Sequence, residues 1–435
     1  MTHAAPFSGP LTRECGEPLA CYARWREQLQ GGEGLLLVDF ALDQPWLDGA
    51  PPLPLTAIYH VCGGALSLAV TDRRIAVDER LPLAEQYRAW VARHRLLDVD
   101  PTLPLRLHTQ TIAKPWGREI WYTGVERRAV CDFAGDAARV PIPWLQAVLP
   151  LAAAGVAGEP LLLLKILDPT AQPVLGDLYF ELHETKREVY VVTRVDRQAW
   201  PDGVGYIRYG FDPQQIARYA DHDQFRQAYL AAVGDYEAQR RAIDELAGQG
   251  GAPHPDALVL EQQLRQRMDR FTAMRPLREG DVVQVPRLLP HALQHGVRVV
   301  EFQTATYERK ILSFAQKVLT QDRWDTREAV ARMLLLPPQE VLSASPDGAA
   351  GATVEQLADF PDFELRRVSL EPGHGWRPGA CPTYRIVMVL SGSLELEGAR
   401  YEAEQAMLLP RLWEGLLAAP QGAPPLVFLL ARPRC

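Results

Sequence analysis

Two stretches of the chain hold histidines and carboxylates at spacings that suit a metal ion. The first is Glu181-x-His183-x4-Glu188, and the second contains His291. Residues i and i+2 of a strand point to the same side, so Glu181 and His183 can face one ion, and a hairpin would return Glu188 beside them. Two imidazoles with one or two carboxylates suit Zn²⁺, Mn²⁺ or Fe²⁺. Such a set leaves a coordination position open for a substrate.

The second stretch, GDVVQVPRLLPHAL, covers residues 280–293. Its proline and the turn after it place His291 at the start of a new strand. Further on, Glu301 alternates with valines on one face of the run 297–307. A carboxylate that points inward needs a partner, so Glu301 is a second kind of candidate functional residue.

Each candidate also has a purely structural alternative. His183 and Glu188 could form an exposed ion pair on a hairpin, because surface ion pairs are common and contribute little. His291 taken alone could be a structural histidine, and Glu181 could orient a ligand instead of binding the metal itself. Lys186 could be a solvated loop residue. The spacing by itself leaves these alternatives open.

The elements that must position these residues are mainly strands. Short apolar or alternating runs bounded by turn residues indicate strands. We expect strands within 34–40, 161–167, 177–195, 280–286, 290–293, 297–307 and 383–410. Helical spacing of apolar residues predicts helices at 19–29, 84–97 and 325–335 and through most of 213–274.

The region 213–274 interrupts the strands and has a break of its own at 248–255. Asp212 and Pro213 suit the N-cap and the first turn of a helix. The apolar stripe that follows is formed by Phe225, Tyr229, Val233 and Tyr236. A further helix is expected over 256–274, with one face formed by Leu260, Leu264, Met268 and Phe271.

The composition is that of a soluble globular protein, and it narrows the range of partners. Of 435 residues, 47% are hydrophobic and 23% are charged, which excludes collagenous, mucin-like and largely disordered chains. The net charge of −8 disfavours nucleic acid and anionic membranes. The six cysteines show no CxxC spacing, and no basic segment leads into an apolar run at the start. We therefore expect a cytoplasmic protein with no signal peptide.

These motifs resemble those of the cupin family of β-barrels. Two ligands one residue apart, followed by a carboxylate, are similar to the first cupin motif, and the Gly, Pro and His of 280–291 are similar to the second. About 114–314 resembles one branch of that family, the type I mannose-6-phosphate isomerases. This resemblance is carried by PLLLLKILDP, Lys186-Arg187-Glu188, GDVVQVPRLLPHAL and HGVRVVEFQTATYERKI. The run VLSGSLELEG resembles the second, metal-free cupin of the branch.

The resemblance implies a role for each candidate residue. The metal ligands would be Glu181, His183, Glu188 and His291, with a glutamate where the family has glutamine. Lys186 and Glu301 would be acid/base residues, and Arg309 would be the cation near the substrate. A carboxylate for an amide at position 181 adds a negative charge beside the metal. That charge should tighten cation binding and weaken the attraction for a phosphorylated substrate.

The implied fold is mainly β: two cupin (jelly-roll) β-barrels, a helical insertion and an N-terminal α+β region. The N-terminal region, of unknown role, would be 1–110, and the helical insertion 213–276. The metal-binding barrel would be formed by 111–212 together with 277–320. A helix and a linker would occupy 321–352, and the metal-free barrel 353–435.

The implied activity is a metal-dependent aldose–ketose isomerisation between mannose 6-phosphate and fructose 6-phosphate, or a related sugar phosphate, by enediol proton transfer. The cofactor would be one divalent metal, Zn²⁺ ahead of Mn²⁺ or Fe²⁺. The partner would be a small-molecule sugar phosphate, with neither nucleic acid nor a membrane. Two alternatives remain open: a non-catalytic cupin-fold protein that binds sugars or regulates, and another metal-dependent cupin enzyme such as a dioxygenase. The oligomeric state is not specified by the sequence.

Overall fold

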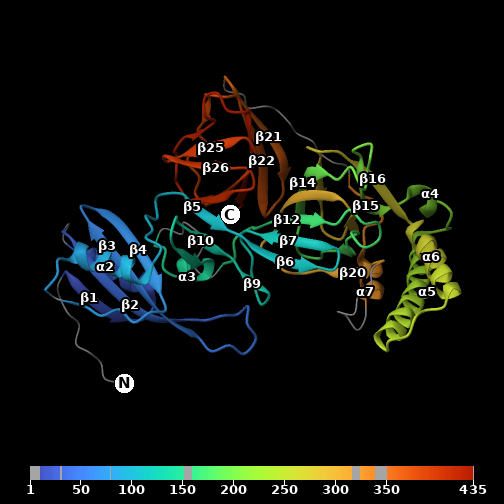
Figure 1. Ribbon diagram of the computed structural model, residues 1–435, viewed down its shortest axis with the longest axis horizontal. Helices are drawn as coiled ribbons and strands as arrows, with labels where there is room; N and C mark the ends of the chain where they lie inside the picture. Colours follow the sequence, from blue (N-terminus) through green and yellow to red (C-terminus); the bar gives the residue numbers. More distant parts are fainter. Residues whose placement is uncertain are drawn as a thin grey trace. The chain divides into compact units, whose positions relative to one another are not determined.

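The computed structural model describes residues 10–29, 32–78, 80–150, 159–315, 324–338 and 350–434. Within these ranges most of the regular structure is β-strand, and the longest helices lie together in one insertion (Figure 1). The expected fold class, mainly β with a helical insertion, is confirmed. Most of the expected linker before the C-terminal part lies outside the described residues, at 339–349.

Contacts between residues divide the chain into two compact units. Unit 1 comprises Met1–Gln110, Trp121–Leu162 and Ser343–Cys435, and unit 2 comprises Thr111–Ile120 and Leu163–Leu342. This division assigns 121–162 to unit 1, whereas the sequence analysis placed that segment in the metal-binding barrel. Every candidate site residue belongs to unit 2.

One part of unit 1 is a four-stranded sheet with two helices. Its strands run in the order β1-β2-β3-β4, with β1 parallel to β2 and the others antiparallel. The strands are β1 (Leu11–Cys15), β2 (Gly34–Leu42), β3 (Leu53–Cys62) and β4 (Ala65–Thr71). The helices are α1 (Pro18–Gln28) and α2 (Leu83–His94), close to the ranges predicted from sequence.

The other part of unit 1 has two sheets that share an apolar core containing Val387, Leu394 and Phe428. The eight-stranded sheet is ordered β11 (Arg139–Pro141), β10 (Asp132–Ala134), β5 (Leu105–His108), β27 (Ala406–Leu409), β24 (Arg385–Ser391), β29 (Leu426–Pro433), β22 (Phe363–Leu370) and β21 (Ala352–Asp359). The four-stranded sheet is ordered β23 (Gly375–Trp376), β28 (Leu417–Ala418), β25 (Ser393–Leu396) and β26 (Ala399–Glu402). The described residues of this part also include a short helix, α3 (Ile142–Gln146), and the strand pair β8 (Val125–Glu126) and β9 (Ala129–Val130).

Unit 2 also contains two sheets. The six-stranded sheet is ordered β17 (Val282–Val285), β14 (Glu188–Val195), β19 (Val297–Gln303), β12 (Leu163–Pro169), β7 (Gly117–Trp121) and β6 (Gln110–Lys114). The five-stranded sheet is ordered β16 (Thr272–Leu277), β15 (Gly205–Phe211), β18 (His291–Leu293), β13 (Phe180–Leu182) and β20 (Lys310–Ser313). One core cluster draws residues from both sheets, among them Leu182 and Val299.

The helical insertion consists of α4 (Pro213–Ile216), α5 (His222–Gly248) and α6 (Pro255–Asp269), and α7 (Thr326–Arg332) follows later in the chain. Asp212 caps α4, as predicted, by accepting a hydrogen bond from Gln214 N. All four residues of the expected stripe on α5 are buried, which confirms that stripe. None of the helices in the described ranges, α5 included, has the length and apolarity needed to cross a membrane.

The second predicted helix is wrong at its end and on one face. Helix α6 stops at Asp269, and Thr272–Leu277 forms β16 instead of a last helical turn. Hydrogen bonding to β15, with Ile207 opposite Arg275, overrides the helical spacing there. Leu260, expected on the buried face, is 44% exposed.

The predicted hairpin between His183 and Glu188 is also wrong. Strand β13 pairs with β18 and β20, whereas β14 pairs with β17 and β19, so the two strands lie in different sheets. The loop between them therefore crosses from one sheet of unit 2 to the other. The period-2 pattern predicted which side chains share a face, but it carries no information about which strand is the neighbour.

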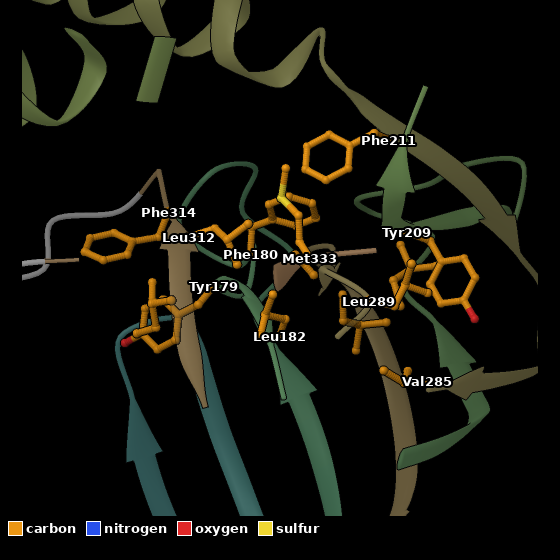
Figure 2. Packing of buried hydrophobic residues seen from close by; sticks show 14 of the residues in the cluster. Tyr179, Phe180, Leu182, Tyr209, Phe211, Val285, Leu289, Leu312, Phe314 and Met333 are labelled. Carbon is orange, nitrogen blue, oxygen red and sulfur yellow. The ribbon is translucent and has the colours of Figure 1, made fainter. Parts of the chain in front are cut away.

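Phe211 joins the five-stranded sheet of unit 2 to the helical insertion. Its ring lies 5.8 Å from that of Phe180 on β13, 5.3 Å from Phe225 and 4.9 Å from Tyr229 on α5. Figure 2 shows Phe211 and Phe180 in the cluster that also contains Leu182, the residue before the first candidate histidine. The same packing thus anchors α5 and the strand that leads into the site.

The substitution Phe211→Ala should destabilise unit 2 by about 3–5 kcal/mol, because it leaves a cavity between β13, β15 and α5. Urea unfolding followed by tryptophan fluorescence should show a lower midpoint. The control is Leu258→Ala, at a position that is 45% exposed and should change the midpoint little. Equal midpoints for the Phe211 variant and the wild type would contradict this packing role.

Candidate metal centre

Three of the predicted ligands converge from both sheets of unit 2. His183 directly follows β13, His291 begins β18, and Glu188 begins β14 in the other sheet. One ligand atom from each of the three lies within 4.8 Å of the other two. All three side chains are buried, at 2% exposure or less. The alternative of an exposed ion pair at His183 and Glu188 is therefore wrong.

Backbone carbonyls orient both imidazoles. His183 Nδ1 lies 2.8 Å from Glu308 O, and His291 Nδ1 lies 3.1 Å from Leu289 O. A carbonyl oxygen only accepts, so Nδ1 carries the proton in each ring. In the neutral ring the other nitrogen, Nε2, then presents a lone pair, the arrangement found in metal-binding histidines.

The two Nε2 atoms point at one carboxylate. His183 Nε2 lies 3.2 Å from Glu188 Oε1, and His291 Nε2 lies 3.0 Å from Glu188 Oε2. Burial, the largest influence, lowers the pKa of His183 although Glu188 opposes it. Burial would raise the pKa of Glu188, but His183 and Lys186 hold it well below its usual value. A neutral imidazole thus faces an ionised carboxylate.

This donor set fits a divalent cation. His183 Nε2 is buried and has no hydrogen-bond partner among the described residues. A lone pair facing a carboxylate oxygen is repulsive unless a proton or a cation lies between them. Two imidazoles and one carboxylate are a ligand set of catalytic zinc sites, which keep a fourth position open.

The fourth predicted ligand, Glu181, lies beside this group. It is opposite His291 in the pairing of β13 with β18, and its Oε1 is 4.0 Å from His183 Nε2. Its Oε2 is 3.5 Å from Arg309 Nη1. Burial would raise the pKa of Glu181, but Arg309, followed by His183, lowers it. Glu181 is therefore an ionised carboxylate placed between the three ligands and a guanidinium group.

Lys186 and Arg309 supply positive charge at the same place. Lys186 is 6% exposed, so the alternative of a solvated loop residue is wrong. Its Nζ lies 2.8 Å from Glu188 Oε1 and donates to Gln303 Oε1 at 3.3 Å. The Arg309 guanidinium lies over the Tyr179 ring at 5.1 Å, and its side chain is 40% exposed. One cation is thus buried against a ligand, and the other faces solvent.

Glu301 lies on the same sheet face as Glu188. In β19 it is opposite Tyr190 of β14 on one side and Lys165 of β12 on the other. Neither carboxyl oxygen has a hydrogen-bond partner in the described part of the chain, although Oε2 is 3.2 Å from Lys165 Nζ. Burial raises the pKa of Glu301 to about 8, with Lys165 opposing the rise and Glu188 adding to it. Its carboxyl group can therefore gain or lose a proton near neutral pH.

Sequence reasoning missed two polar residues of this interior. Tyr190 donates to Glu188 Oε2 at 2.8 Å. Burial would lower the pKa of Lys165, but Glu301 and Glu119 raise it, so it stays a cation. A signal for Lys165 was present, because it is the one charged residue in the apolar run 161–167. Tyr190 gave no such signal, since tyrosine is ordinary in a buried strand.

Solved structures share this architecture. The mannose 6-phosphate isomerase from Bacillus subtilis matches 76% of this chain and 99% of its own, at 14% identity and a TM-score of 0.56. A zinc-bound mannose 6-phosphate isomerase matches 76% of this chain and 100% of its own, at 13% identity and a TM-score of 0.53. A single-substitution variant of the phosphomannose isomerase from Salmonella typhimurium gives the same identity, coverage and TM-score as that zinc-bound structure.

No family model and no curated protein matches the chain in sequence. The likeness therefore concerns the fold: 76% of this chain has the fold of solved mannose 6-phosphate isomerases. Within that fold, the described residues contain a buried His–Glu–His group able to hold a metal ion.

Purified wild-type protein dialysed against Zn²⁺ should retain about one ion per chain, since the described residues contain one such group. His291→Ala should lose that ion, because it leaves only one imidazole and one carboxylate. His254→Ala is the control, at a side chain that is 75% exposed and remote in sequence from the ligands. Metal content measured by atomic emission decides the outcome, and full occupancy of the His291 variant would refute the assignment.

The raised pKa of Glu301 should make stability depend on pH. A carboxyl group with a higher pKa in the folded chain contributes its stability fully below the ordinary value of 4.5. That contribution is lost as pH rises through about 8, with a slope of at most about 1.4 kcal/mol per pH unit for one group. Metal-free wild type should therefore lose stability relative to Glu301→Gln between these pH values.

Urea midpoints of the two proteins, measured at intervals from pH 4.5 to 8 in a chelator, test this pH dependence. Titratable groups remote from Glu301 contribute equally to both proteins and cancel in the difference, so the difference reports Glu301 together with the groups it interacts with, such as Lys165 and Glu188. Parallel curves would mean that Glu301 has an ordinary pKa.

Proposed function

We propose that the protein is a metal-dependent aldose–ketose isomerase that interconverts mannose 6-phosphate and fructose 6-phosphate, or a related sugar phosphate. The observation that carries the proposal is the buried group of His183, Glu188 and His291. It occurs in a chain with the fold of proteins named mannose 6-phosphate isomerases, one of them zinc-bound. The isomerisation needs a cation for a developing oxyanion and a group that moves a proton between adjacent carbons.

Zn²⁺ bound by the two histidines and Glu188 would stabilise negative charge on the substrate oxygen. The protein's own residues would carry the proton. Glu301 suits this task because its carboxyl oxygens are buried without hydrogen-bond partners among the described residues and its pKa is raised to about 8. An acid/base group is most effective when its pKa is near the working pH.

Lys186 would assist at the metal end of the site. Its ammonium group lies 2.8 Å from Glu188 Oε1, so it compensates the charge of that carboxylate and can donate to a substrate oxygen close to it. Lys165 holds Glu301 by an ion pair of 3.2 Å. The proton acceptor and the oxyanion region would thus each have a lysine beside them.

Arg309 would hold the phosphate group, because a guanidinium binds phosphate oxygens through paired hydrogen bonds. Its partial exposure leaves it open to a ligand arriving from solvent. Its ion pair with Glu181, at 3.5 Å, must loosen when phosphate binds. The carboxylate at position 181 would therefore favour the cation and weaken phosphate binding, which is the effect that the sequence predicts.

A coupled assay that detects fructose 6-phosphate formed from mannose 6-phosphate tests the proposal. Zn²⁺-loaded wild type should turn over, and His291→Ala should not. Glu301→Gln should lower kcat by about 10²–10⁴-fold with little change in KM, because it removes proton transfer without removing a metal ligand. Glu237→Gln, on α5, is the control and should behave as wild type.

Absence of turnover of mannose 6-phosphate and of related aldose phosphates, in a wild-type protein that holds Zn²⁺, would refute the isomerase and favour a sugar-binding protein. Oxygen consumption by an Fe²⁺-loaded sample would identify a dioxygenase instead.

A further inference from the structure

We propose that Glu308 is a positioning residue of the metal centre: it fixes the loop between β13 and β14 so that His183 and Lys186 face Glu188. The inference rests on the proposed function and extends it to a residue outside the predicted site. Glu308 lies between β19 and β20, immediately before Arg309.

The Glu308 side chain binds the start of the loop. Its Oε2 accepts hydrogen bonds from Glu184 N at 2.8 Å, Thr185 N at 3.1 Å and Thr185 Oγ1 at 3.2 Å. Hydrogen bonds from two successive backbone N–H groups to one carboxylate oxygen fix the direction of the chain, and bonds to an ionised acceptor are the stronger kind. The residues that follow His183 are therefore held by one side chain.

The backbone of Glu308 holds the histidine ring itself. Its carbonyl oxygen accepts from His183 Nδ1 at 2.8 Å, which sets the tautomer and turns Nε2 toward Glu188. The His183 backbone is held from another side, because Leu288 N donates to His183 O at 2.7 Å. One residue thus fixes both the ring of a candidate ligand and the loop that leaves it.

The C-terminal end of the loop is hydrogen-bonded to Thr304, which precedes Glu308 in the chain. Arg187 N donates to Thr304 Oγ1 at 2.9 Å, and Thr304 N donates to Arg187 O at 3.0 Å. Lys186 lies between the residues held by Glu308 and the one held by Thr304, and it donates to Gln303 Oε1. Strands β13 and β14 belong to different sheets, so no ladder between them fixes this loop. The segment 303–308 supplies that restraint.

Arg309, the residue after Glu308, contacts a second carboxylate of the site. Arg309 faces Glu181 at 3.5 Å, so the dipeptide 308–309 contacts both Glu181 and His183. Partners of this kind commonly matter for metal affinity, and their loss typically weakens it about 10–100-fold. A substitution of the Glu308 side chain leaves its carbonyl bond to His183 in place and removes the bonds to Glu184 and Thr185, so it should weaken metal affinity through the loop.

Three substitutions separate the geometry of Glu308 from its charge. Glu308→Gln keeps an acceptor oxygen at the same distance from the backbone and removes the charge. Glu308→Asp keeps the charge but is one methylene too short to reach Glu184 N and Thr185 N. Glu308→Ala removes both. The matched control is the same series at Glu237, which pairs with Arg241 at 2.7 Å on α5.

Two measurements on the full chain test the proposal. Hydrogen exchange of the Glu184 and Thr185 amides in metal-free protein should be faster in the Asp and Ala variants and unchanged in the Gln variant. Zn²⁺ affinity, from competition with a chromogenic chelator, should fall about 10–100-fold in Asp and Ala and stay near wild type in Gln. Circular dichroism melts show whether each variant is folded.

The outcomes are separable. Wild-type affinity in the Asp and Ala variants would overturn the positioning role, even if the enzyme isomerises its substrate. Weak binding in Gln together with wild-type binding in Asp would show that charge matters instead of the hydrogen bonds, and would also overturn it. If the wild type bound no Zn²⁺, the proposed function would fail, whereas the amide exchange pattern would still decide whether Glu308 holds the loop.

Discussion

One buried carboxylate between two imidazoles is the constraint on which unit 2 depends. Glu188 comes from the six-stranded sheet, whereas His183 and His291 come from the five-stranded sheet. Both ring nitrogens that face it are available as donors of a lone pair because the opposite nitrogens are engaged by carbonyl groups. Burying such a set without a proton or a cation is unfavourable. The interior of the fold thus has a built-in requirement for positive charge, which Lys186 meets only in part.

Further charged side chains lie beside Glu188 in the six-stranded sheet and form a polar row. Glu301 pairs with Lys165, and Glu119 with Lys114, each at 3.2 Å and largely buried. Buried ion pairs are weak contributors to stability compared with well-packed apolar side chains, and unit 1 encloses an apolar core of the latter kind. Unit 2 has an apolar core as well, so its charged residues are not needed for burial and suit the proposed activity instead. The pKa of Glu301 is raised because burial and the nearby Glu188 carboxylate favour the protonated, uncharged form of its side chain.

Sequence patterns predicted the composition of the site better than its topology. Period-2 alternation predicted that Glu181 and His183 lie on one side, whereas Glu188 joins them from the other sheet, which no local pattern predicted. The hairpin that was to join them is absent, because pairing partners are decided by contacts remote in sequence. The end of α6 was missed for the same reason, since pairing with β15 outweighs local periodicity. Glu308 could not be found from spacing at all: it acts through bonds to residues more than 120 positions earlier.

The helical insertion lies in the chain between the second and third ligands, and this has a consequence for biosynthesis. Glu188 and His291 are separated by 103 positions, most of them in β15, α4, α5 and α6. A nascent chain leaving the ribosome exposes His183 and Glu188 long before His291, so the group of three side chains is incomplete at that stage. If α5 and α6 pack as they emerge, they bring the two ends of this long segment closer and reduce the entropy cost of joining them. The insertion would then act as a spacer: any metal that needs all three side chains could bind only after His291 has been synthesised.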